Sequence, residues 1–155
     1  MNQNNIRSAV RAIIIEDRKI LMCKYVDSRG EFYACVGGGQ NKFEYMHSAL
    51  KRECLEEVNA RISIGELVFV REAFFDYDSG GEKFEKIHQI ECFFKCKLED
   101  VSEVAIGYEP DKSSIGIEWL DIDDFDKLRV YPSAFKDYIC SDGSIKDTVY
   151  IGLEK

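Results

Sequence analysis

The chain has 155 residues, of which 45% are hydrophobic and 32% charged, a balance typical of one globular domain and too apolar for disorder. Its formal net charge of -8 argues against a nucleic-acid duplex as partner, because duplex binding depends on Lys and Arg side chains that neutralise phosphates. The sequence has no signal-peptide core and no apolar run near the roughly 18 residues of a membrane span, so we expect a cytoplasmic protein without a membrane contact.

The first half of the chain predicts three strands and a helix. Residues 8–16 and 20–26 are apolar and rich in β-branched side chains, which predicts a hairpin. Residues 31–36 predict a third strand, which we expect Gly37 to Gly39 to end. Residues 45–58 contain neither Gly nor Pro and many helix formers, which predicts a helix.

Two long strands follow, at 66–77 and 86–98, joined by the turn-forming residues 78–84. Alternation in the second strand places Cys92 and Phe94 on one face, which indicates a strand buried on one side. Glu91 would then lie on the opposite face, and we expect it to be a surface residue.

The last part of the chain is predicted to contain a loop, a strand with a short helix, another helix and an edge strand. These elements are expected at 99–114, 115–125, 132–139 and 147–153 respectively. Strands lie before and after the helices without regular βαβ alternation, so the expected fold class is α+β with a mixed sheet. We expect residues 1–155 to form a single domain.

The six cysteines include no Cys-x-x-Cys pair, which argues against a zinc site. Free Cys is among the most buried residue types and behaves as a small hydrophobe. The sequence therefore predicts reduced thiols that are mostly buried.

Three carboxylates are concentrated on the predicted helix. At about 100° per residue, Glu53, Glu56 and Glu57 share one arc of the helix surface, so their charges repel. Most acidic clusters on helices are solvated faces, and a bound cation is the alternative. Hard oxygen ligands favour Mg2+, Mn2+ or Ca2+. The surrounding residues favour the cation, because the glycines 37–39 allow a ligand to approach the backbone and Arg52 lies four residues before Glu56.

This segment resembles the Nudix box, whose pattern is G-x5-E-x7-R-E-U-x-E-E-x-G-U with U an apolar residue. Six residues match the pattern at residues 38–60 without a gap: Gly38, Glu44, Arg52, Glu53, Glu56 and Glu57. Two departures are mild. Cys54 stands at an apolar position, and Asn59 replaces the last glycine at a place where Asn tolerates the left-handed conformation.

The resemblance implies an α/β/α sandwich and a hydrolase that splits the pyrophosphate bond of a nucleoside diphosphate linked to another group X, with Mg2+ or Mn2+. Metal ligands implied by position are Glu53, Glu56, Glu57 and the Gly37 carbonyl. Arg52 would orient the glutamates, and Glu44 would support the loop. Because many family members are homodimers, a homodimer is one arrangement that the resemblance implies.

A carboxylate must also take the proton of the attacking water. The sequence leaves several candidates for this general base open: Glu56, Glu57, Glu91, Glu103 and Glu109. We expect Glu56, Glu57, Arg52 and Glu91 to be the catalytic residues.

Substrate contacts are expected outside the metal ligands. Gly38 and Gly39 would approach the substrate, Arg71 could contact phosphate, and Phe32 and Tyr77 could stack on a base. Tyr77 also stands where a tyrosine marks Nudix hydrolases of diadenosine polyphosphates, and no proline stands where ADP-ribose pyrophosphatases carry one.

Three functions fit these residues. The first is a metal-dependent pyrophosphohydrolase, which the complete set of matching residues favours. The second is a nucleotide-sensing Nudix module without catalysis, which would not need all three glutamates. The third is a house-cleaning hydrolase of oxidised nucleoside triphosphates, which differs from the first only in its substrate.

Overall fold

The computed structural model describes residues 5–78, 84–147 and 149–154. It contains a curled mixed β-sheet with the long helix on one side and the short C-terminal helix on the other, so the α+β prediction is confirmed. The expected turn at residues 78–84 lies mostly outside the described residues.

The strands and helices follow the predicted order, apart from two short strands at Gly37–Gly39 and Val130–Tyr131 that the sequence did not predict. The elements are β1 (Arg7–Glu16), β2 (Lys19–Asp27), β3 (Gly30–Cys35), β4 (Gly37–Gly39), α1 (Met46–Val58), β5 (Ile62–Asp78), β6 (Phe84–Leu98), β7 (Ser114–Asp121), β8 (Val130–Tyr131), α2 (Phe135–Tyr138) and β9 (Tyr150–Glu154). Single turns of 3-10 helix lie at Val101–Glu103 and Ile122–Asp124. None of the described helices is long and apolar enough to cross a membrane.

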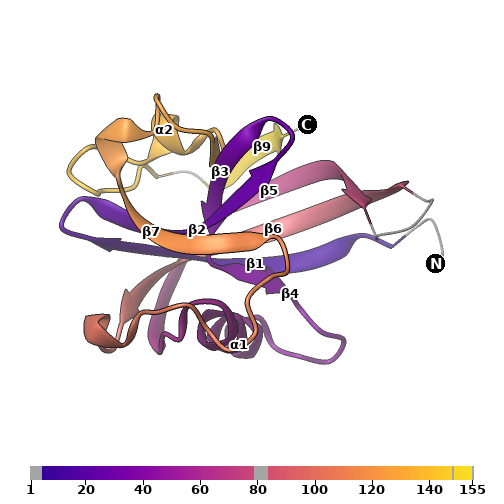
Figure 1. Ribbon diagram of the computed structural model, residues 1–155, viewed down its shortest axis with the longest axis horizontal. Coiled ribbons are helices and arrows are strands. Elements are labelled where there is room, and N and C mark those ends of the chain that lie inside the picture. The colour runs from indigo at the N-terminus through magenta and orange to yellow at the C-terminus, as the bar shows by residue number, and fades with distance from the viewer. Residues whose placement is uncertain (1–4, 79–83, 148, 155) are drawn as a thin grey trace.

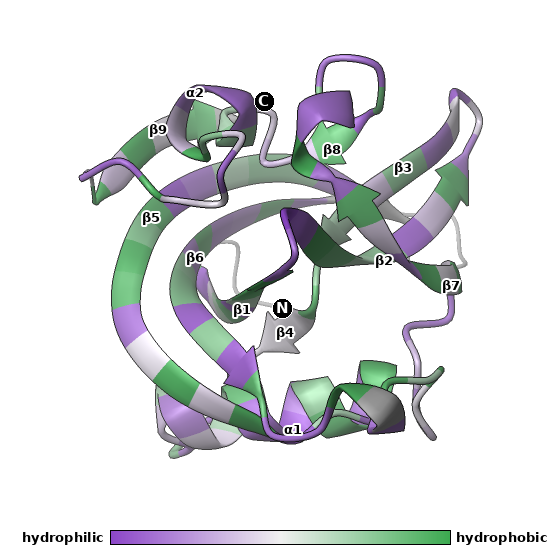
Figure 2. Cartoon of the chain, turned by 90° about the vertical axis from the view of Figure 1, so that its left-hand side faces the viewer, coloured by the Kyte–Doolittle hydropathy of each residue, from purple (hydrophilic) through white to green (hydrophobic). Residues whose placement is uncertain are grey.

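The sheet is organised around β1, which is shared between its two halves. The strand order is β8-β3-β2-β1-β6-β5-β9, with β4 paired to β1 and β7 paired to β2. The first part of β1 pairs in parallel with β6, and its last residues pair antiparallel with β2 as the predicted hairpin. Figure 2 shows β5 and β6 curling between α1 below and α2 above.

Two apolar clusters hold these layers together. Beneath the sheet, Val10 and Ile14 of β1 pack with Leu50, Cys54 and Val58 of α1. Above the sheet, a second cluster forms around three phenylalanines: Phe69 of β5, Phe93 of β6 and Phe135 of α2. Because both faces of the sheet are covered, the strands are buried on both sides.

Three expectations need correction. Gly37 to Gly39 do not simply end a strand, because they form β4 and pair antiparallel with β1. The predicted helix at 132–139 is only Phe135–Tyr138, since the Phe135 amide bonds to the Pro132 carbonyl (3.1 Å) in a turn that precedes it. The middle of β6 is buried on both faces, because Phe93 lies in the upper cluster and Cys92 in the lower one.

The end of α1 and the state of the thiols agree with prediction. Asn59 takes the left-handed conformation (φ 53°) just after the helix, and its amide bonds to the Leu55 carbonyl (3.2 Å). All six cysteines are free thiols, five of them buried.

Candidate active site

Arg52 connects the glutamates of α1 to the glycine strand β4. Its guanidinium donates to both oxygens of Glu44 (2.8 and 2.9 Å), to Glu53 (2.8 Å), to Glu56 (3.1 Å) and to the Gly39 carbonyl (3.0 Å). These charge-assisted bonds fix the direction of each carboxylate. They also lower the pKa of Glu44 to about 2, with help from the Asn41 amide, which donates to the same carboxylate.

Glu57 is placed differently from its two neighbours, because its side chain is only 7% exposed. One oxygen accepts from the Gly37 amide (2.9 Å), and the Cys23 thiol lies 3.7 Å from the same oxygen. Burial raises the pKa of Glu57 to about 7, although the Gly37 bond and the charge of Arg11 oppose the rise. A buried carboxylate of this kind is stabilised by a nearby cation.

The glycines of β4 let the strand lie directly against the glutamates. A Cβ added to Gly38 would lie 2.5 Å from a carboxylate oxygen of Glu53, closer than real Cβ atoms approach oxygen. Gly37 has φ +138°, which L side chains rarely adopt, and a side chain there would overlap the backbone of β1. The sequence predicted that these glycines let a ligand approach the backbone; in the structure Gly37 and Gly38 approach β1 and Glu53.

A loop that the sequence did not connect to the site covers the end of α1. The amides of Ala105, Gly107 and Glu109 donate to the last carbonyls of the helix, at Val58 (3.1 Å), Glu57 (2.9 Å) and Glu56 (3.0 Å). A side chain on Gly107 would overlap the Glu56 carbonyl, so this glycine permits the contact. The loop places Glu109 beside Glu56, whereas the Glu103 carbonyl bonds to Asn59 (3.0 Å).

Glu91 is not a surface residue, and that expectation was wrong. It is 1% exposed because the upper cluster covers its face of β6. One oxygen accepts from Arg11 of β1 (2.9 Å), and the other accepts from Arg71 of β5. Burial would raise the pKa of Glu91, but the two guanidinium charges outweigh it and hold that pKa below its usual value. Arg11 also donates to the Gly37 carbonyl (2.5 Å), so it links this buried cluster to β4.

The other expected substrate contacts lie apart from one another. The Phe32 ring stacks on Tyr25 (5.1 Å between centroids), and the Arg129 guanidinium lies 4.7 Å from its centre. Arg71 lies on the upper face of the sheet beside Glu91. The backbone of Tyr77 pairs with Glu85 near the far end of β5, and the structure describes only the backbone there.

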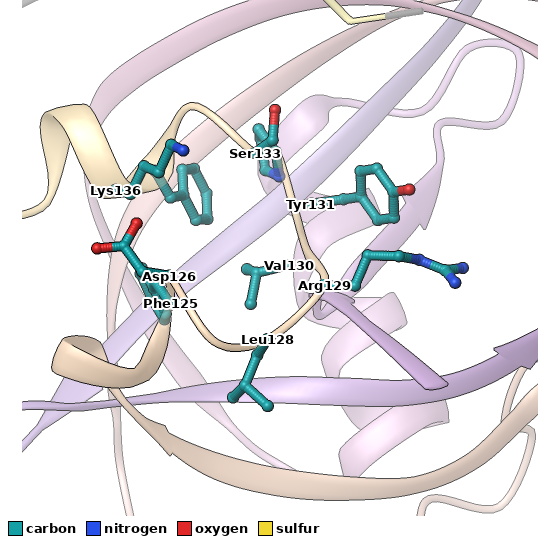
Figure 3. Close-up of a pocket in the computed structure, with 10 residues that line it drawn as sticks. Phe125, Asp126, Leu128, Arg129, Val130, Tyr131, Ser133 and Lys136 are labelled. Carbon is teal, nitrogen blue, oxygen red and sulfur yellow. The ribbon is translucent and has the colours of Figure 1, made fainter. Parts of the chain in front are cut away.

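A cavity of about 210 Å³ lies along residues 125–136, and none of the predicted site residues lines it (Figure 3). Phe125, Val130 and Phe135 are among its apolar lining residues, and Lys136 and Tyr131 also line it. It is separate from the carboxylates of α1.

The carboxylate oxygens that make no hydrogen bond are suitable ligands for a divalent cation. Glu53, Glu56 and Glu57 each keep one oxygen that makes no hydrogen bond with the part of the chain that the structure describes. Oxygen donors of this kind suit Mg2+ or Mn2+. In the described residues, however, no three acidic, His or Cys side chains are already gathered as a metal site, because Arg52 holds two of the glutamates and Gly37 the third.

Comparisons with known proteins show what this chain is similar to. A family model described as NUDIX domain matches residues 5–138. A NUDIX hydrolase from Nitrosomonas europaea is similar in structure, with a TM-score of 0.68, 19% identity and coverage of 97% of this chain and 80% of that one. No curated protein sequence matches the chain.

Two further structures are similar. An ADP-ribose pyrophosphatase from Streptococcus suis has a TM-score of 0.59 at 14% identity, covering 97% of this chain and 100% of that one. A Caenorhabditis elegans Ap4A hydrolase has a TM-score of 0.55 at 17% identity, covering 79% and 85%. At these identities the structures establish the fold, and the family model establishes the family. The chain therefore belongs to the Nudix family.

Proposed function

We propose that this protein hydrolyses the pyrophosphate bond of a nucleoside diphosphate linked to another group, by attack of water on phosphorus with Mg2+ or Mn2+ bound. The observation that carries the proposal is the arrangement of Glu53, Glu56 and Glu57, each with one oxygen directed by the protein and one left open. The similar structures named as an ADP-ribose pyrophosphatase and an Ap4A hydrolase support a substrate of this class.

In this proposal the three glutamates are the metal ligands. The Gly37 carbonyl is a fourth candidate ligand, although it also accepts from Arg11 (2.5 Å). When bound, the cations would neutralise phosphate oxygens and lower the pKa of the attacking water. Arg52 acts through the carboxylates that it orients, and Glu44 acts by fixing Arg52.

The protein must also supply an acceptor for the proton of water. Glu56 and Glu57 are already at the site, and the backbone of Glu109 is bonded to Glu56. Glu91 has the weakest support, because both of its oxygens are bonded to arginines and its pKa is lowered. A carboxylate held in that way is a poor base.

Substrate contacts are proposed along β4 and the face above it. Gly38 and Gly39 would let the phosphates approach the backbone. Arg71 lies on the same face, and Phe32 and Tyr77 remain candidates for stacking on a base. A nucleoside triphosphate with an oxidised base is an alternative substrate that the same carboxylates would serve.

A panel assay tests this proposal. Nucleotide sugars, dinucleoside polyphosphates and nucleoside triphosphates are incubated with the protein and Mg2+ or Mn2+, and phosphate released after phosphatase treatment is measured. We expect turnover of at least one member, and a loss of about 100-fold or more in Glu57→Gln, because transition-state charge stabilisation accounts for much of such catalysis. Glu66→Gln, an exposed glutamate of β5, is the matched control and should keep full activity.

The panel also separates catalysis from sensing. Nucleotide binding without turnover of any member would refute hydrolysis and favour a sensing role. Equal activity of Glu57→Gln and Glu66→Gln would refute the role of the carboxylates.

A further inference from the structure

Arg7, the first residue of β1, extends its side chain across the last glycine of β4. Its Nη2 atom lies 2.7 Å from the point where a Cβ on Gly39 would lie, and its Cζ and Nε atoms lie 3.2 Å from that point. The guanidinium therefore occupies the space that a side chain at residue 39 would fill. Gly39 is the residue that lets Arg7 reach the site.

A neutral amide holds the Arg7 side chain in this position. Nη1 donates to Oε1 of Gln89, which is 1% exposed, and Nε2 of Gln89 donates to Glu91 (2.8 Å). Among residues 5–78, 84–147 and 149–154, Arg7 forms no ion pair with a carboxylate. Desolvation of the guanidinium and repulsion from Arg11 lower the pKa of Arg7, although the charges of Glu53, Glu91 and Asp111 oppose the fall.

Glu91 does not pair directly with Arg7. It accepts from Arg11 and Arg71, and it is linked to Arg7 only through Gln89. The charges of Glu53 and Asp111 also act on Arg7, but neither carboxylate forms an ion pair with it in the part of the chain that the structure describes. A partly buried guanidinium that is held by a neutral amide is suited to bind an anion.

The position of Arg7 beside the carboxylates identifies the anion. Consecutive residues of a strand point to opposite faces, and Gly38 faces the Glu53 carboxylate while Gly39 faces Arg7. Their Cα atoms are about 3.8 Å apart. Glu53 and Arg7 therefore flank adjacent glycines, and a phosphate chain that extends from cations at Glu53 past Gly39 would come within reach of the Arg7 guanidinium.

We propose that Arg7 binds a phosphate group of the substrate, donating across Gly39 to the phosphate chain from the side opposite Glu53. This inference rests on the proposed function, because it assumes a diphosphate substrate at the carboxylates. Arg7 is a substrate-binding residue in this account, and the buried Gln89 holds it in position.

Arg7→Gln removes the charge while it keeps a polar side chain at the same place. We expect kcat/KM to fall about 10- to 100-fold, the value of one charge-assisted hydrogen bond. Most of the loss should appear in KM, because the contact exists before and during reaction. The control is Arg18→Gln, an arginine paired with Asp123 at the β1–β2 turn, which should leave KM unchanged.

Gly39→Ala provides a second test that keeps the charge. The new Cβ would displace the flexible end of Arg7, so the fold should persist while KM rises to a similar extent. Because both changes remove one contact, Arg7→Gln combined with Gly39→Ala should be no worse than Arg7→Gln alone. An Arg7→Gln enzyme with the KM of Arg18→Gln would overturn the inference, as would losses that multiply in the double variant.

Binding separates this inference from the proposed function. If the wild-type protein turns over no panel substrate, the proposed function fails, and Arg7 is judged by calorimetry with inorganic pyrophosphate, with and without Mg2+. We expect Arg7→Gln to weaken pyrophosphate binding about 10-fold or more. Equal pyrophosphate affinities in wild type and Arg7→Gln would overturn the inference, whatever the panel shows.

Discussion

Replacement of Arg52 by Gln removes the cation that holds Glu53 and Glu56 on one face of α1. The wild-type guanidinium donates to these carboxylates at 2.8 and 3.1 Å, and its side chain is 28% exposed. Each bond to a charged group contributes about 1.5 kcal/mol at the lower end of the usual range, which suits this partial exposure. Loss of both should lower the free energy of unfolding by about 3 kcal/mol in the absence of metal, and the lost bonds to Glu44 and the Gly39 carbonyl make this a lower limit.

Added Mg2+ should recover part of that loss in Arg52→Gln, because a bound cation also relieves the repulsion between the two glutamates. Metal affinity should nevertheless fall about 10- to 100-fold, since the ligands are no longer oriented. Urea denaturation at about pH 7.5, once in EDTA and once in about 10 mM Mg2+, measures both effects. The matched control is Arg18→Gln, whose exposed ion pair with Asp123 should contribute no more than about 1 kcal/mol.

The reasoning would be refuted by an Arg52→Gln protein as stable as Arg18→Gln in EDTA. An Arg52→Gln protein with the stability and the metal affinity of the wild type would also refute it. Either result would mean that the bonds of Arg52 do not determine the positions of Glu53 and Glu56.

Three other predictions follow from single contacts. Gly38→Ala should weaken Mg2+ binding about 10-fold or more in calorimetry, because its Cβ would force the Glu53 carboxylate away, and an unchanged affinity would contradict the close approach. Glu57 has a folded pKa of about 7, raised from 4.5, so its contribution to metal-free stability is present below pH 4.5 and is lost as pH rises through 7. Between pH 4.5 and 7, the free energy of unfolding of the wild type should fall by about 3 kcal/mol relative to that of Glu57→Gln in urea denaturation with EDTA. Parallel pH profiles of the two proteins would contradict the raised pKa. Glu91→Gln should lower the free energy of unfolding by about 3 to 5 kcal/mol at pH 7, because it removes the buried carboxylate charge that Arg11 and Arg71 share. Since the pKa of Glu91 is lowered, that difference should shrink as pH falls below the ordinary carboxyl value, and a cost under about 1 kcal/mol at pH 7 would show that the pairs are not buried.

The grouping of the carboxylates of α1 was predictable because it depends only on spacing along one helix. Arg52, Glu53 and Glu56 lie within one turn and a half of a helix, so their spacing alone brings them together. The glycines before the helix also predicted a close approach to the backbone, but the sequence did not predict that they pair with β1.

The buried arginine cluster was not predictable, because it depends on register between distant strands. Glu91 meets Ala9 of β1 and Arg71 of β5 in the sheet, and the Arg11 and Arg71 side chains that bind it lie 80 and 20 residues away in the sequence. Alternation along β6 correctly placed Glu91 on the strand face opposite Cys92. It could not show that Phe135 and its neighbours cover that face. The bonds of the loop at Ala105 and Gly107 to the end of α1 had no sequence signal beyond the glycine itself.

Calorimetric titration with Mg2+, in wild type and in Glu53→Gln, Glu56→Gln and Glu57→Gln, tests the central claim most directly. The wild-type protein should bind Mg2+ at millimolar levels or tighter in the presence of a nucleotide product, and each variant should bind about 10-fold more weakly or worse. Glu66→Gln should match the wild type. Equal Mg2+ binding in all four proteins, or none in the wild type beside a nucleotide, would contradict the claim that these three carboxylates hold the metal.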